Sequence, residues 1–156
     1  TGAGIMDSKR ALESAGGDMA KAAEILKQQG LARAAKKAER KAEQGLVEAY
    51  IHAGGRIGAM VEVNCETDFV ARTEDFKRLV HDIAMQVAAT SPKAVGNEPD
   101  LQEGEGEGKI PSSEILLKQP FIKEPSISVG DLIQNTIAKL GENIVVRRFA
   151  RYELGG

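Results

Sequence analysis

The sequence contains no tryptophan, one cysteine and two histidines, and only 4% of its 156 residues are aromatic. A single cysteine cannot form an internal disulfide, which fits a reducing compartment. No apolar run approaches the ~20 residues that a membrane-spanning helix needs, and no signal peptide opens the chain. We therefore expect a cytosolic protein without a membrane partner.

The charge is close to balanced, with 21 basic and 23 acidic side chains and a formal net charge of −2. Any attraction to nucleic acid must then come from a local basic patch. Apolar residues make up 42% of the chain, but aromatic residues are few, so the predicted core is aliphatic and modest. The length suits one compact domain with a small appended module.

The first part of the chain has helical patterns with few large side chains. Residues 1–30 predict a partial helical module of two short helices, with Asp7 and Asp18 as caps and a stop at Gly30. Residues 31–45 predict a charged helical arm with almost no apolar face. Because both parts bury little, the core must lie further along the chain.

The remaining residues, 46–154, predict a core domain of strands and helices. Its elements in order are two strands, a helix, a flexible acidic linker, a helix and a strand, expected over 46–52, 56–65, 73–90, 91–112, 129–140 and 142–154. The glycine-bearing segment between the first two strands predicts a hairpin. This order indicates an α+β fold, in which a small antiparallel sheet packs against helices.

Two groups on the second predicted strand invite a chemical interpretation. Cys65 shares a face with apolar residues, so we interpret it as a small buried side chain rather than an activated thiol. Glu62, Asn64 and Glu66 line the other face. Two carboxylates without histidine or cysteine make a poor metal site, so a solvated face is expected there.

Two further motifs could contact phosphate. TGAGIM lacks the preceding strand of a dinucleotide fingerprint and the Gly-Lys-Ser/Thr ending of a phosphate loop, so we expect a turn that presents Ile5 and Met6. Residues 33–41 carry five positive charges and one negative charge, without interleaved aromatic residues. A protein that binds RNA or the ribosome through this basic helix, with steep salt dependence, is therefore an alternative function.

Asp68 and Phe69 lie between a predicted strand and a predicted helix, on a tight exposed connection. In one interpretation Asp68 caps a helical turn and Phe69 packs inward. In the other, Phe69 is an anchor that fills a partner's pocket, worth ~1.5–3 kcal/mol. The pattern alone leaves both open.

Five blocks resemble, in this order, the translation elongation factor Ts family: TGAGIMDSKRAL, AAKKAER, VEVNCETDFVAR, KQPFI and GENIVVRRF. The blocks span most of the chain, and VNCETDFVAR is highly specific to the family. The resemblance implies a guanine-nucleotide exchange factor that binds elongation factor Tu, GDP-bound or nucleotide-free. It implies no covalent chemistry, no cofactor and no specific nucleic acid.

The resemblance also implies roles for particular residues. In the family, the element here formed by Thr67, Asp68, Phe69 and Val70 presses on the GTPase domain and wedges its aromatic ring beside the nucleotide and magnesium site. The Gly-Ala-Gly loop opens a small ubiquitin-associated-like module that also contacts this domain. The contacts carried over from that loop are Ile5, Met6, Asp7 and Lys9.

The chain departs from the family pattern in three respects. It lacks a helix upstream of TGAG, so it resembles an N-terminally truncated member, and its Glu/Gly linker replaces a helical insertion. It has one Thr-Asp-Phe half, as short members have. These can pair as homodimers, and a chain with edge strands has reason to do so. The implied location is a bacterial cytoplasm, or a mitochondrion or plastid if the source is organellar.

Overall fold

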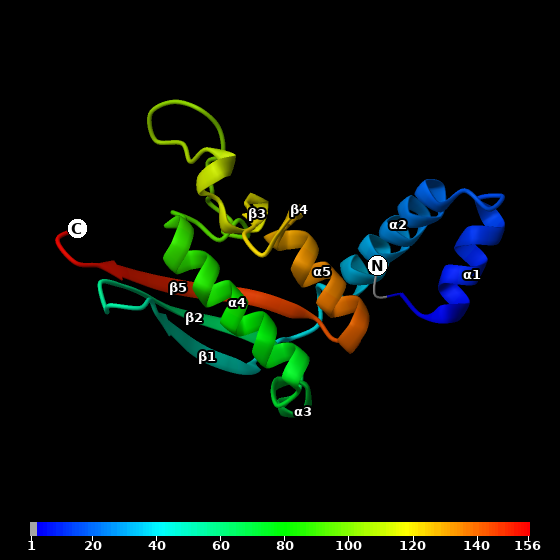
Figure 1. The fold of residues 1–156 in the computed structure, drawn as a ribbon, viewed down its shortest axis with the longest axis horizontal. Helices are drawn as coiled ribbons and strands as arrows, with labels where there is room; N and C mark the ends of the chain where they lie inside the picture. The colour runs from blue at the N-terminus through cyan, green and yellow to red at the C-terminus, as the bar shows by residue number, and fades with distance from the viewer. Residues whose placement is uncertain (1–2) are drawn as a thin grey trace.

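A computed structural model describes residues 3–156, and the first two residues of the predicted TGAG turn lie outside this range. Its elements are α1 (Ile5–Ser14), α2 (Met19–Lys37), β1 (Gln44–Ile51), β2 (Ile57–Cys65), α3 (Asp68–Ala71), α4 (Glu74–Thr90), two 3-10 turns (Ser112–Glu114 and Leu116–Lys118), β3 (Pro120–Phe121), β4 (Glu124–Ser128), α5 (Val129–Leu140) and β5 (Ile144–Glu153). Figure 1 shows helices packed against a small antiparallel sheet, which confirms the α+β class.

The helices α1 and α2 form a hairpin beside the sheet domain (Figure 1). Asp18 caps α2 as predicted, by accepting hydrogen bonds from the backbone N–H groups of Ala20 and Lys21. Asp7 does not cap α1, because the helix already begins at Ile5 and Asp7 lies in its first turn. That prediction was wrong because the helix starts within the glycine-rich segment.

The predicted stop at Gly30 is also wrong, since α2 continues through it to Lys37. Alanine-rich residues after Gly30 favour helix strongly enough to offset the ~1 kcal/mol cost of one glycine. Ala34 is buried in the core cluster, where the end of α2 packs against α5. Part of the predicted solvated arm is therefore a packed extension of the helical module.

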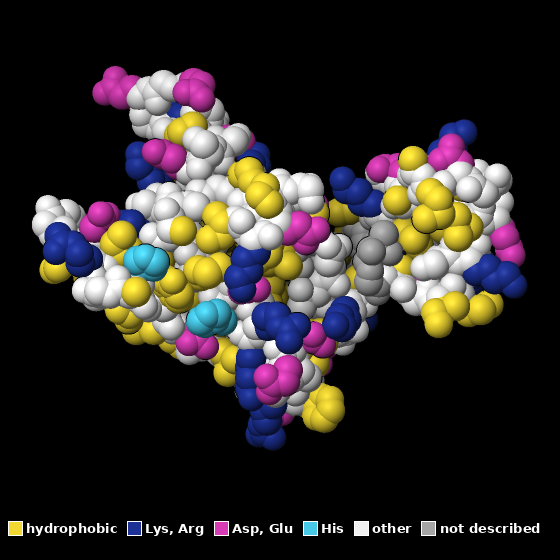
Figure 2. All heavy atoms as spheres, viewed as in Figure 1, with side chains coloured by type: hydrophobic (Ala, Val, Ile, Leu, Met, Phe, Trp, Pro, Cys, Tyr) yellow, Lys and Arg dark blue, Asp and Glu magenta, His cyan; other side chains and the backbone are white. Residues whose placement is uncertain are grey.

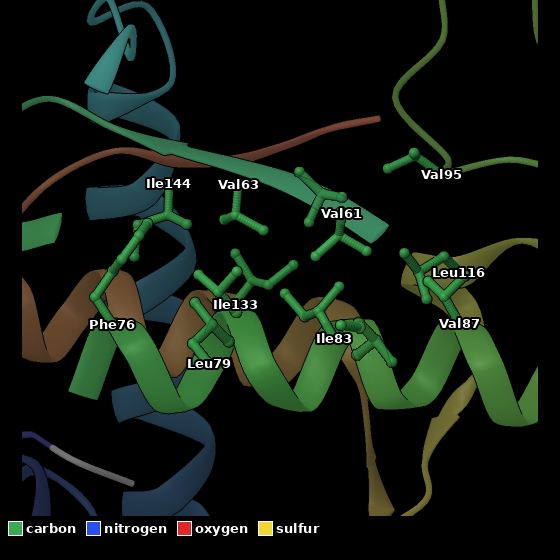
Figure 3. Close-up of a cluster of buried hydrophobic side chains, with 14 of the residues drawn as sticks. Val61, Val63, Phe76, Leu79, Ile83, Val87, Val95, Leu116, Ile133 and Ile144 are labelled. Carbon is green, nitrogen blue, oxygen red and sulfur yellow. The ribbon is translucent and has the colours of Figure 1, made fainter. Parts of the chain in front are cut away.

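The main sheet has the order β1-β2-β5, with antiparallel neighbours. The inward residues of β2 alternate as predicted, and those buried are Ala59, Val61, Val63 and Cys65. The apolar stripe of α4 covers this face, and all of its residues are buried: Phe76, Leu79, Val80, Ile83, Ala84, Val87 and Ala88. Figure 3 shows side chains of β2 and α4 pointing toward one another, with Ile133 of α5 in the same cluster.

The segment predicted as a flexible linker, 91–112, is packed at its start. Ala94 and Val95 are buried, and their carbonyls accept hydrogen bonds from the N–H groups of Leu116 and Leu117 at 2.9 and 3.0 Å. Irregular chain can thus be ordered by backbone bridges that leave no periodic pattern. The acidic residues that follow form the loop at the top of Figure 1.

The last helix agrees with its prediction. Ser128 caps α5 in a capping box with Asp131, and Gly141 ends it in the left-handed conformation, with φ of 77°. Only a residue without a side-chain penalty adopts this φ readily, so the chain turns here and enters β5. The turn brings the start of β5 beside the end of β2.

Candidate protein-interaction site

The connection from β2 to α4 is a single helical turn whose cap is Thr67. We call residues 66–71 the Phe69 corner. The Thr67 hydroxyl oxygen accepts a hydrogen bond from the N–H of Val70 at 3.3 Å. Asp68 is the first helical residue, and its exposed carboxylate pairs with Arg72 at 2.8 Å. Thr67, and not Asp68, therefore caps the turn.

Phe69 points away from the core, with 77% of its surface exposed. The interpretation in which it packs inward is wrong. Val70, the next residue of the turn, is buried in the core cluster, so in this structure it supports the corner from inside. Figure 2 shows hydrophobic atoms projecting beside charged side chains at the foot of the molecule, where Figure 1 places α3. An outward ring on a core-anchored turn has the form of an interface anchor.

The Phe69 corner is fastened to the turn between α5 and β5. The Glu142 carboxylate accepts hydrogen bonds from the N–H of Glu66 at 3.2 Å, the N–H of Thr67 at 3.0 Å and the Thr67 hydroxyl at 2.7 Å. In return, the Glu66 carboxylate accepts the N–H of Asn143 at 2.7 Å. The sequence pattern around Glu142 does not reveal this role, because a contact across 75 residues leaves no local signal.

The predicted contacts at the start of the chain lie on α1. Ile5 and Met6 are 87% and 61% exposed. Asp7 pairs with Arg33 of α2 at 2.9 Å, and this hydrogen bond holds the pKa of Asp7 below its ordinary value. Lys9 lies 3.9 Å from Glu13 on the surface. Ile5 and Met6 are therefore available for contact, whereas the Asp7 carboxylate is engaged by Arg33 of α2.

The sequence model of the family described as Elongation factor TS matches residues 19–103 and 66–156. Relatives named Elongation factor Ts include that of Carboxydothermus hydrogenoformans, 54% identical over 99% of this chain and 84% of its own length. Those of Moorella thermoacetica and Synechococcus sp. (strain JA-3-3Ab) are 53% and 51% identical over 99% of this chain and 90% and 65% of theirs. The chain belongs to the elongation factor Ts family.

Membership in the elongation factor Ts family implies a nucleotide exchange factor for elongation factor Tu. The alignment with the Carboxydothermus relative runs over 182 residues, more than the 156 of this chain, so that relative carries residues that this chain lacks. This agrees with the expectation that a family insertion is missing.

In this member of the family, Cys65 is a buried structural residue. It is fully enclosed, and its thiol donates to the carbonyl oxygen of Thr67 at 3.1 Å. Burial raises the pKa of Cys65 to about 11, with the nearby Glu142 carboxylate acting in the same direction. Because the thiolate is the nucleophilic form, a thiol active site at this position is excluded.

The raised pKa of Cys65 predicts how the stability of the fold depends on pH and how slowly the thiol reacts with a labelling reagent. The ordinary value of 9.0 applies to the unfolded chain and about 11 to the folded one, so stability is retained below pH 9 and lost as the pH rises toward 11. We expect an aromatic disulfide reagent to label the native protein at pH 8 at least ~100-fold more slowly than the urea-unfolded chain. Equal labelling rates would contradict the buried thiol.

The polar face of β2 differs from its prediction. Asn64 is buried, and it donates to the Glu62 carboxylate at 3.0 Å and accepts from Arg147 at 2.9 Å. The hydrogen bond from Asn64, helped by Arg148, holds the pKa of Glu62 below its ordinary value. A solvated face was the wrong expectation for Asn64, because β5 supplies arginines that alternation in β2 cannot reveal.

Within residues 3–156, no cluster of three or more His, Cys, Asp or Glu side chains could hold a metal ion.

The basic run at 33–41 is partly neutralised. Arg33 pairs with Asp7, and Arg40 lies 3.6 Å from Glu66. Lys41 lies 4.0 Å from Glu43. These pairs weaken the positive field that RNA would meet, but RNA binding through this helix stays a prediction.

Across the described part of the chain, no helix is long and apolar enough to cross a membrane.

Proposed function

We propose that this chain accelerates GDP release from elongation factor Tu by pressing the Phe69 corner against its GTPase domain, beside the nucleotide and magnesium site. The observation that carries the proposal is Phe69, an exposed ring on a core-anchored turn in a member of this family. The action requires no covalent chemistry and no cofactor. The bacterial relatives support a cytoplasmic location.

The physical requirement is a difference in affinity between two states of the partner. A factor releases GDP only if it binds the nucleotide-free GTPase better than the loaded one, and each tenfold loss of GDP affinity corresponds to ~1.4 kcal/mol of coupling. Filling an apolar pocket with Phe69 supplies ~1.5–3 kcal/mol. Because the corner is already ordered by Thr67 and Glu142, little conformational entropy is lost on binding.

The exposed pair Ile5 and Met6 on α1 supports a second contact with the same partner. The ion pair between Asp7 and Arg33 links this helix to α2. Figure 1 places α1 away from α3, so in this proposal the two contacts fall on separate parts of the GTPase domain.

The test is stopped-flow release of a fluorescent GDP analogue from elongation factor Tu, with and without this chain. We expect release to accelerate with the concentration of the chain and to reach a plateau. A folded chain that leaves the release rate unchanged would refute the exchange function.

We also propose a homodimer, formed through the face of the sheet that α4 leaves uncovered. Its exposed apolar side chains include Val47 and Ile51 of β1, Met60 of β2 and Tyr152 of β5. A shallow groove of about 390 Å³ lies on the sheet near the β1–β2 turn, and its lining includes Ile51, Met60 and Tyr152. A second copy of the same face would cover the patch, as apolar surface of this kind favours.

If the homodimer forms through this face, a charge placed there should weaken the association. Met60→Glu places a carboxylate on the central strand, where burial without a partner is costly, and should weaken dimerisation at least ~10-fold. Sedimentation equilibrium measures the association, and Ile122→Glu on the β3–β4 turn is the matched control because it adds the same charge outside the sheet. A wild-type chain that stays monomeric at high concentration would contradict the proposal.

A further inference from the structure

Glu142 contacts the residue that orients Phe69. The hydroxyl of Thr67 has one hydrogen, which it donates to Glu142 at 2.7 Å, and its oxygen accepts the N–H of Val70 at 3.3 Å. The rotamer that caps α3 is therefore the rotamer that Glu142 holds. Phe69 lies in the turn that this cap starts, so a change at Glu142 is transmitted to the ring.

The Phe69 corner needs such support from outside. The helix α3 has four residues, and helices of this length are unstable alone. Glu142 also accepts the N–H groups of Glu66 and Thr67, so three of its hydrogen bonds converge on the residues just before the turn. An ionised carboxylate only accepts hydrogen bonds, which matches three donors.

A second link makes the arrangement reciprocal. Asn143, next to Glu142, donates its N–H to Glu66, and its buried side chain donates to the carbonyl of Arg40 at 2.9 Å. The corner is thus joined at two points to the turn that follows Gly141, and through Asn143 to the segment after α2. The Phe69 corner cannot tilt without breaking these bonds.

We propose that Glu142 is a positioning residue for nucleotide exchange, which fixes the direction in which Phe69 is presented. The inference rests on the proposed function. A ring on a mobile corner can still enter a pocket of the partner. It then adapts to the conformation of the partner and does not change it. Such a ring binds the loaded and nucleotide-free states with similar free energy, and a contact without that difference cannot shift the equilibrium.

The test measures two quantities for each variant. They are the plateau rate of GDP release and the concentration of the chain that gives half of this rate. Glu142→Ala should lower the plateau about tenfold, equivalent to ~1.4 kcal/mol, and change the half-saturating concentration less than ~3-fold. Glu142→Gln keeps the oxygen that accepts both backbone N–H groups and should restore the plateau to within ~3-fold of wild type.

The matched control is Lys139→Ala. Lys139 pairs with Asp75 at 3.0 Å and so also joins α5 to α4, but it makes no hydrogen bond or ion pair with residues 66–67. Its plateau rate should equal that of wild type. Thermal melts of all variants are recorded, and the assay is run well below each transition. A lower melting temperature with an unchanged plateau in Glu142→Ala would overturn the inference.

A double-variant cycle separates the inference from the proposed function. If Glu142 acts through Phe69, adding Glu142→Ala to Phe69→Ala should lower the plateau no further. A further tenfold loss would overturn the positioning role while the exchange function stands. If Phe69→Ala alone leaves release unchanged, the wedge in the proposed function fails and this inference fails with it.

Discussion

Replacing Phe69 with alanine is expected to slow GDP release from elongation factor Tu in the presence of this chain by about 10- to 100-fold, the loss of ~1.5–3 kcal/mol of pocket filling. The fold should be unaffected, because 77% of the ring is exposed and its removal opens no cavity. Surface substitutions of this kind change the free energy of unfolding by about 0.5 kcal/mol or less.

The measurement is the plateau rate of GDP release, with circular dichroism to confirm folding. Ile122→Ala is the matched control, since Ile122 is 41% exposed and lies on the β3–β4 turn, away from α3 and from the proposed dimer face (Figure 1). It should release GDP at the wild-type rate. Adding Asp68→Ala to Phe69→Ala should remove most of the remaining acceleration. A folded Phe69→Ala variant with the wild-type rate would show that another surface performs the exchange.

Replacing Phe76 with alanine is expected to destabilise the protein by ~3–5 kcal/mol, the usual result of removing a fully buried ring. Phe76 lies seven residues from Phe69 in the chain but has no exposed surface. In Figure 3 its ring lies at the end of the core near Ile144, between α4 and the sheet. A typical domain has a free energy of unfolding of only about 5–15 kcal/mol, so this substitution removes a large part of the stability.

Urea unfolding followed by far-ultraviolet circular dichroism measures this effect, because the chain has no tryptophan to report by fluorescence. Phe76→Leu is the milder comparison and should cost about 1–1.5 kcal/mol, since it fills most of the volume. A loss below about 1 kcal/mol in Phe76→Ala would contradict the packing of α4 on the sheet.

The two phenylalanines illustrate which parts of the fold are predictable from sequence. Phe76 belongs to a helical stripe in which every turn repeats the signal, so its burial follows from periodicity alone. Phe69 lies on a single turn that has no period, and its direction depends on Val70 filling the core beside it. Local caps such as Asp18 and Ser128 were equally predictable, since they act within three residues.

Structural features that depend on contacts between distant residues could not be predicted from the sequence. Asn64 is buried because Arg147 approaches it from β5, 83 residues later in the chain. Glu142 lies in a block that resembles the family, but its three hydrogen bonds to the Phe69 corner are visible only in the fold. At Gly30 two local rules competed, and the helix preference of the following alanines prevailed.

The unbroken helix α2 has a consequence for how the two proposed contact surfaces cooperate. Its 19 residues span roughly 28 Å at the helical rise, which makes it a stiff spacer between α1 and the core. Once Phe69 is bound, Ile5 and Met6 are held at one distance from the partner and need not search a wide volume. Such a bivalent ligand has a high effective concentration for its second contact, which a flexible break at Gly30 would have reduced.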